Sequence, residues 1–413
     1  MVSNQRSFYL LLAGTFFIFL NFNIAQVITP VYILAIGGSE FVSGLQSTLF
    51  YLTAVVLRFY FGPLADAKGN RITLFIGGLA FMTAPLLFLF SQSLWYVLLV
   101  RMYQAIGLAA YFSSASAVVS ALAPRGKVGA YIGFYRLVTM STLLVGPTLA
   151  LKVLNSFGYT WYHLLGIAIG FLAMAFLHFV KEPPKTENHA ALVPDAPVAA
   201  APAASAPAAV DPVIKPGLGM LSLLKDKKLI PIFQSIFLVS ICYGLVQTFS
   251  AIYVEQAAPH INSGLFFTVF GIGSIISSLI SGTLSDRKGR AEVVFPWIMI
   301  MGTGLALLYF LPLQSWLLYF GSFLSGFGYA GSIAVLISWV VDVVPISRRT
   351  TALALEDSTI DIGIGLGSFF FGVLIPLLGL PWSYAASGLL LLVFAGWKIT
   401  TMIVGKRKPL PLG

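Results

Sequence analysis

Twelve apolar segments dominate the 413-residue chain, and each is long enough to cross a lipid bilayer as a helix. Hydrophobic residues make up 58% of the chain and charged residues only 9%, whereas about a quarter of the residues in soluble domains are charged. Because backbone polar groups must be paired inside lipid, these segments predict an all-α membrane protein. We place its twelve transmembrane helices at 8–34, 41–61, 72–90, 94–122, 129–154, 160–180, 230–254, 263–284, 292–311, 315–342, 352–377 and 382–404.

A charged motif occurs twice, each time between two apolar segments, where we expect a short loop. The first copy has Gly62, Leu64, Asp66, Lys68 and Gly69, and the second has Gly282, Leu284, Asp286, Lys288 and Gly289 at the same spacing. Such a repeat predicts two pseudo-symmetric six-helix bundles, at 1–180 and 229–413, and is typical of transporter folds. The Ala/Pro-rich stretch 181–228 between them cannot bury a core, so it is predicted to be a cytoplasmic linker.

The distribution of Lys and Arg predicts the orientation of the chain in the membrane. The loops at 35–40, 91–93, 155–159, 255–262, 312–314 and 378–381 contain neither residue, whereas the alternate loops, the linker and the tail each carry Lys, Arg or both. Basic loops stay on the cytoplasmic side. Both termini are therefore predicted to be cytoplasmic, and the formal net charge of +10 is read as an orientation signal rather than as a nucleic-acid footprint.

The repeated motif resembles the signature of the major facilitator superfamily, which joins the second and third spans of each half. Further similarities are Arg101 to Gly107 in the fourth span, Gly146-Pro147 of the antiporter motif in the fifth, and Asp361 to Gly367 in the eleventh. The last of these is similar to a pattern in bacterial efflux members, including drug exporters and exporters of opine-type metallophores. The resemblance implies the twelve-helix major facilitator fold, proton-coupled efflux and a bacterial-type cytoplasmic (inner) membrane. The motif residues that it marks as gating loops are Gly62, Asp66, Gly69, Arg71, Gly282, Asp286, Gly289 and Arg290.

Ionisable residues inside the spans are the first candidates for function, since charges are costly in lipid. The first half embeds three cations and the second half three acids: Arg58, Arg101 and Arg136, and Glu356, Asp357 and Asp361. If the halves face each other, the six charges balance.

The depth of these residues predicts a gate at the cytoplasmic side. The family's architecture packs spans two and eleven together, so Arg58 is expected to meet Glu356 or Asp357; the alternative is that Arg58 reaches lipid phosphates. Asp66 is expected to dock on the positively charged N-terminus of span eleven. Asp286 would do the same at span five, near Gly129. Alternatively, both acids serve only loop folding and membrane insertion.

Asp361, deeper in span eleven, is the first choice for the coupling acid, because an apolar environment favours the protonated form of a carboxyl group. The alternatives are a permanent ion pair with Arg101 or Arg136, or simple polar packing. The two arginines either attract an anionic or zwitterionic substrate, or retune Asp361, or only hold neighbouring helices. Six polar residues either line the substrate cavity that the family places here or join helices: Asn21, Asn23, Gln26, Gln104, Tyr243 and Gln247.

Other chemistries lack the context that they need. Gly326 to Gly331 matches a dinucleotide-binding pattern but lies inside a predicted span, without a preceding strand. The four histidines are scattered, so no metal, cofactor or enzyme activity is expected. We therefore predict a monomeric secondary transporter that exports a small organic molecule by proton antiport with alternating access. The alternatives are proton-coupled import of a small metabolite, and a membrane receptor or scaffold that transports nothing.

Overall fold

The chain folds into long helices that lie side by side. The computed structural model describes residues 2–124, 127–181, 223, 225–345 and 348–407, and this part contains no strand. Twelve of its helices are long and apolar enough to cross a membrane. Their bounds are α1 Val2–Ala35, α2 Glu40–Lys68, α3 Asn70–Leu87, α4 Leu94–Leu122, α5 Val128–Phe157, α6 Tyr159–His178, α8 Ile230–Ala257, α9 Gly264–Lys288, α10 Arg290–Leu307, α11 Leu317–Val343, α12 Arg349–Leu378 and α13 Leu380–Arg407.

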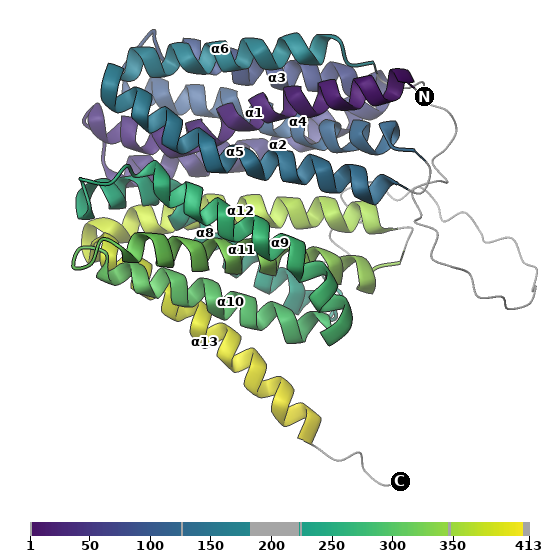
Figure 1. Ribbon diagram of the computed structural model, residues 1–413, viewed down its shortest axis with the longest axis vertical. Coiled ribbons are helices and arrows are strands. Elements are labelled where there is room, and N and C mark those ends of the chain that lie inside the picture. The colour runs from purple at the N-terminus through teal and green to yellow at the C-terminus, as the bar shows by residue number, and fades with distance from the viewer. Residues whose placement is uncertain (1, 125–126, 182–222, 224, 346–347, 408–413) are drawn as a thin grey trace, which may run out of the picture.

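Two helical bundles form the molecule, and the predicted fold class is confirmed. Helices α1 to α6 lie together in one half and α8 to α13 in the other, with α5 and α12 near the boundary (Figure 1). A 3₁₀ turn, η2 (Leu308–Phe310), follows α10. Residues 182–222 and 224 of the predicted linker lie outside the described residues.

Glycines with positive φ end several helices and define two ends of the molecule. Gly69 and Gly289, with φ of 94° and 101°, lie between α2 and α3 and between α9 and α10, at what we call the motif end. Gly37, Gly158 and Gly379 lie at what we call the opposite end. Only glycine adopts such angles readily.

The loops predicted for the repeated motif are mostly helix. α2 continues to Lys68 and α9 to Lys288, so Gly62 to Lys68 and Gly282 to Lys288 are helical turns and a single glycine makes each connection. The prediction was wrong because it ended each span where the sequence becomes polar. Leu, Ala and Lys propagate a helix outside the apolar layer as well as inside it.

The halves touch closely at the opposite end, through two equivalent helix pairs. α2 packs against α12 and α5 against α9. A Cβ atom at Gly44 would overlap the carbonyl oxygen of Ser368, and one at Gly264 would overlap Thr148. Glycine therefore permits the two close approaches.

Hydrogen bonds repeat across these two interfaces. Thr48 Oγ1 donates to the Gly365 carbonyl at 2.7 Å, and Thr268 Oγ1 donates to the Leu144 carbonyl at 2.6 Å. Gly44 and Thr48 stand in α2 at the same spacing as Gly264 and Thr268 in α9. The sequence repeat therefore extends from the motif into the packing surface.

Toward the motif end the same helix faces have no close neighbour. Gly62 on α2, Gly282 on α9 and Gly133 on α5 lie on the same helix faces as the contacting residues, yet nothing lies within 4 Å of a Cβ atom built at any of them. The halves are thus closed together at the opposite end and separated along these faces at the motif end.

Candidate functional site

One ion pair joins the two halves in the middle of the molecule. Arg58 Nη2 of α2 lies 2.5 Å from Asp361 Oδ2 of α12, and Asp361 is 7% exposed. The expectation that Arg58 meets Glu356 or Asp357 was wrong, as was the choice of Arg101 or Arg136 as the partner of Asp361. The reason is geometric: side chains tilt toward the N-terminus of their helix, and the antiparallel α2 and α12 therefore direct these two toward each other.

The equivalent position in the other interface carries no charge. Arg58 lies ten residues after Thr48, and Asp361 four before Gly365; the same steps from Thr268 and Leu144 lead to Ser278 and Met140. Ser278 Oγ lies 3.9 Å from Met140 Sδ. The two pseudo-equivalent interfaces thus pack alike, and among the described residues an ion pair is found in the α2–α12 interface and not in the α5–α9 interface. The α5–α9 interface packs with Ser278 and Met140 where the α2–α12 interface has an ion pair.

A second acid is buried beside the pair. Glu356 of α12 is 2% exposed, and its Oε1 atom has no hydrogen-bond partner among the described residues. Nη1 of Arg58 likewise lacks one there. Buried polar atoms are nearly always hydrogen-bonded, so unsatisfied ones mark candidate functional groups. Glu356 Oε1 can therefore still take up a proton or accept a hydrogen bond, and Arg58 Nη1 can still donate one.

Charges at this site do not balance. Glu356 and Asp357 lie within electrostatic range of both Arg58 and Arg136, and Asp357 and Arg136 are exposed. With Asp361, three carboxyl groups stand against two guanidinium groups. The balance of three against three expected from the sequence fails because Arg101 is held elsewhere. The central acidic cluster, as we call Glu356, Asp357 and Asp361 with Arg58 and Arg136, carries one negative charge in excess when fully ionised.

Aromatic rings adjoin this cluster from three helices. Tyr243 of α8 and Tyr329 of α11 stack at 3.9 Å between ring centroids, and Tyr329 lies within electrostatic range of Asp361 and Glu356. Tyr51 of α2 donates to Gln247 Oε1 of α8 at 2.8 Å, which is a further polar contact between the halves. Carboxylates beside aromatic rings suit an organic cation.

Arg101 is fully buried within the first half, surrounded by glutamines. Its guanidinium donates to Gln26 Oε1 at 2.7 Å, to Gln46 Oε1 at 2.5 Å and to Gln104 Oε1. The Phe50 ring lies 4.3 Å from Arg101 Cζ. None of the three hydrogen bonds goes to a carboxylate. Gln26 and Gln104 therefore hold Arg101 in place.

The two asparagines predicted to line the cavity join helices of the first half. Asn21 Nδ2 donates to the Gly166 carbonyl of α6 at 2.8 Å, and Asn23 Nδ2 donates to Thr142 Oγ1 of α5 at 2.8 Å. The alternative role that the sequence left open, helix joining, matches these contacts.

The charged motif residues lie at the motif end, near the surface. Asp66 is exposed in the last turn of α2, and Arg71 donates to the His178 carbonyl at 3.2 Å. Asp286 pairs with Arg290 at 2.6 Å, and Arg290 also binds Asp342 at 2.7 Å. This ion pair lies within the second half, and the predicted contact of Asp286 with α5 near Gly129, next to residues outside the described part of the chain, stays a prediction. Docking of Asp66 on α12 stays a prediction.

The family model of the Major Facilitator Superfamily matches residues 11–292 and 257–411, which together span nearly the whole chain. The chain belongs to the Major Facilitator Superfamily. It is an integral, multi-pass membrane transporter, and the predicted resemblance is confirmed.

Relatives within this superfamily include exporters of drugs and a carrier of amines. The "Multi-drug resistance efflux pump PmrA homolog" of Lactococcus lactis subsp. lactis (strain IL1403) is 22% identical over 312 residues, covering 71% of this chain and 69% of the relative. The "Chromaffin granule amine transporter" of Rattus norvegicus is 25% identical over 352 residues, covering 83% of this chain and 62% of the relative.

A solved structure of the same fold is a bacterial homolog of the human lysosomal transporter Spinster, in an inward-facing and unoccupied conformation. It has a TM-score of 0.72 and 15% sequence identity, and the match covers 99% of both chains. At this identity the likeness concerns the fold alone.

Sequence reasoning missed several residues of the site. Tyr51, Gln46 and Tyr329 are uncharged and stand in apolar helices, so nothing distinguished them from packing residues. One signal was present: Gly44 and Thr48 repeat as Gly264 and Thr268 at the offset of the motif. Extending the repeat along both helices would have identified the two interfaces, and Arg58 as the residue that breaks their symmetry.

Proposed function

We propose that this transporter exports a small organic cation from the cytoplasm in exchange for protons, across a bacterial-type inner membrane. The observation that carries the proposal is the central acidic cluster, in which an ion pair joins the halves beside the buried and incompletely paired Glu356. The motif end, where the halves separate, is then the cytoplasmic end, in agreement with the predicted orientation.

Exchange of a proton for an organic cation follows from the single excess negative charge of the central acidic cluster. One proton or one monovalent organic cation neutralises the cluster, and both together would leave it positive. Because both bind to the same cluster, each therefore lowers the affinity for the other. A cation arriving from the motif end displaces a proton from Glu356 or Asp361. A proton arriving from the opposite end then displaces the cation.

The ion pair couples this exchange to the movement of the halves. Arg58 belongs to α2 and Asp361 to α12, so neutralising Asp361 weakens a contact between the halves. The pseudo-equivalent Ser278 and Met140 support a role beyond packing, since the second interface forms without an ion pair. The amine carrier and the efflux pump among the relatives support the substrate class and the direction.

Inverted membrane vesicles test the proposal. With an acidic lumen established by respiration and reported by a pH-sensitive dye, addition of tetraphenylphosphonium is expected to dissipate part of the pH gradient when the wild-type protein is present. Glu356→Gln is expected to reduce this response about tenfold or more, because the exchangeable proton is lost. The double variant Arg58→Ser with Asp361→Met, which copies the uncharged interface, is expected to fold and to give no response.

Arg290→Lys at the motif end serves as a matched control that alters a surface ion pair. A wild-type protein that moves the cation without changing the pH gradient contradicts proton antiport. Import by symport predicts no dissipation when the cation is added outside these vesicles.

A further inference from the structure

A cavity lies between the halves at the opposite end of the molecule, far from the central acidic cluster. It has a volume of about 530 Å³ and is lined from the first half by the ends of α1 and α5 and the start of α6, and from the second half by the end of α8. Glu255 and Tyr243 are twelve residues apart on α8, hence about 18 Å by helix rise. We call this cavity the outer pocket.

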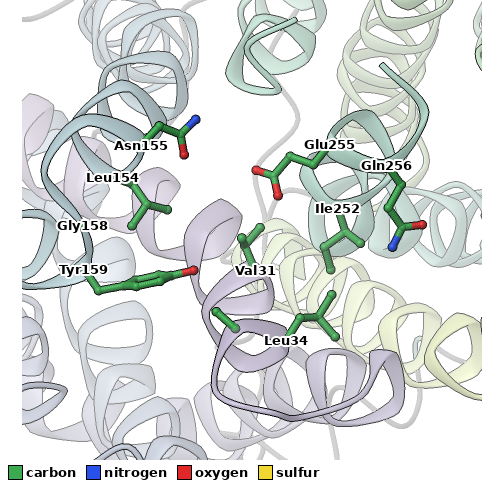
Figure 2. Close-up of a pocket in the computed structure, with 10 residues that line it drawn as sticks. Val31, Leu34, Leu154, Asn155, Gly158, Tyr159, Ile252, Glu255 and Gln256 are labelled. Carbon is green, nitrogen blue, oxygen red and sulfur yellow. The ribbon is translucent and has the colours of Figure 1, made fainter. Parts of the chain in front are cut away.

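The walls of the outer pocket combine an apolar surface with one charge. Val31, Leu34, Leu154 and Ile252 supply aliphatic side chains, and Glu255 is the only charged residue among those lining it. Figure 2 shows the Glu255 carboxylate and the Tyr159 hydroxyl pointing from opposite sides toward the middle of the space. The pocket is large enough for a drug-sized molecule.

Neighbouring residues hold both polar groups in position. Ser263 Oγ lies 3.1 Å from Glu255 Oε1 and donates to it. The Tyr159 ring packs on Tyr32 at 4.8 Å between ring centroids, and Tyr32 in turn contacts His163. A carboxylate, an aromatic ring and apolar walls are together the chemistry that binds an organic ammonium or phosphonium ion.

We propose that the outer pocket is a second binding site for an organic cation, built by Glu255 and Tyr159 and occupied by the substrate on its way out. The class of ligand rests on the proposed function, whereas the pocket, its charge and its position do not. Because α5 and α6 of one half and α8 of the other build it, movement of the halves changes its shape. A cation released from the central acidic cluster toward the opposite end meets this carboxylate last.

Protection of a cysteine tests the site. In a Cys242→Ala background, which removes the single native cysteine, Asn155→Cys places a thiol in the pocket wall. The protein is held in nanodiscs, where both ends are accessible, and labelled with a charged methanethiosulfonate. Tetraphenylphosphonium is expected to slow the labelling, and Glu255→Gln to raise the concentration needed for half-protection about tenfold. Gln256→Cys, on the other half, provides a second reporter should Asn155→Cys fail to fold.

Two further variants separate this site from the central one. Glu40→Gln, which removes an acid at the same end but outside the lining, is expected to leave protection unchanged. Glu356→Gln is likewise expected to leave the protection of the cysteine by tetraphenylphosphonium unchanged. Protection that Glu356→Gln abolishes and Glu255→Gln does not would come from the central acidic cluster, and would overturn the outer site while the proposed function stands. Absence of protection at cation concentrations that dissipate the pH gradient in vesicles would also overturn it.

Discussion

At the scale of residues, the arginines of the first half have different surroundings although the sequence presents them alike. Arg58 pairs with an acid of the other half, Arg136 is exposed near the acids, and Arg101 is enclosed by three glutamines. Because a charged side chain is costly inside a membrane, the sequence predicted a functional or structural role for each of the three arginines. It could not predict their partners, because amide oxygens satisfy a guanidinium as carboxylates do and glutamines do not stand out in a sequence.

Replacing Arg101 by Ala is expected to destabilise the protein by about 3 kcal/mol, since three buried amide oxygens lose their donor and a cavity remains. Denaturant unfolding in detergent micelles measures the change. Arg287→Ala, at an exposed position in the last turn of α9, is the matched control and is expected to shift stability by less than about 0.5 kcal/mol. Equal effects of the two replacements would refute the structural role of Arg101.

At the scale of helices, apolar length predicted the spans well and their polar ends less well. α4 begins and ends at the predicted residues, whereas α2 runs seven residues past the predicted 61, to Lys68. Hydropathy indicates where the apolar part of a helix ends. The helix itself ends where its backbone hydrogen bonds end, which for α2 is at Gly69. The same limit misplaced the motif in a loop. It also hid that Gly44, Thr48, Arg58 and Gly62 form a row along one face of α2.

Two glycines of that row are expected to respond oppositely to alanine. Gly44→Ala places a methyl group against the Ser368 carbonyl and is expected to cost about 1–3 kcal/mol, as overpacking does. Gly62→Ala meets open space and is expected to gain up to about 1 kcal/mol from helix propensity. Thermal unfolding in one detergent compares them. A Gly44→Ala variant as stable as the wild type would show that the close approach of α2 and α12 is dispensable.

At the scale of the whole molecule, sequence repeats predicted two halves, and the family match agrees with the fold that they imply. The halves meet through two equivalent interfaces, closed at the opposite end and apart at the motif end. The end at which the halves separate could not be predicted from the sequence, because in alternating access the same residues must allow the halves to separate at either end. The two interfaces differ at one pair of equivalent positions: Arg58 and Asp361 form an ion pair in one, and Ser278 and Met140 stand there in the other. We assign coupling to the interface with the ion pair.

Proton release on substrate binding tests that assignment most directly. Tetraphenylphosphonium is added to purified protein in weakly buffered solution, and the released protons are counted against the bound cation. About one proton is expected to be released per bound cation while the cluster is protonated, and the cation affinity is expected to rise up to about tenfold per pH unit. Release should fall to zero at high pH, where the cluster has already lost its proton, and in Glu356→Gln it should be strongly reduced. Cation binding without proton release anywhere between about pH 5 and about pH 9 would contradict exchange at a shared acidic site.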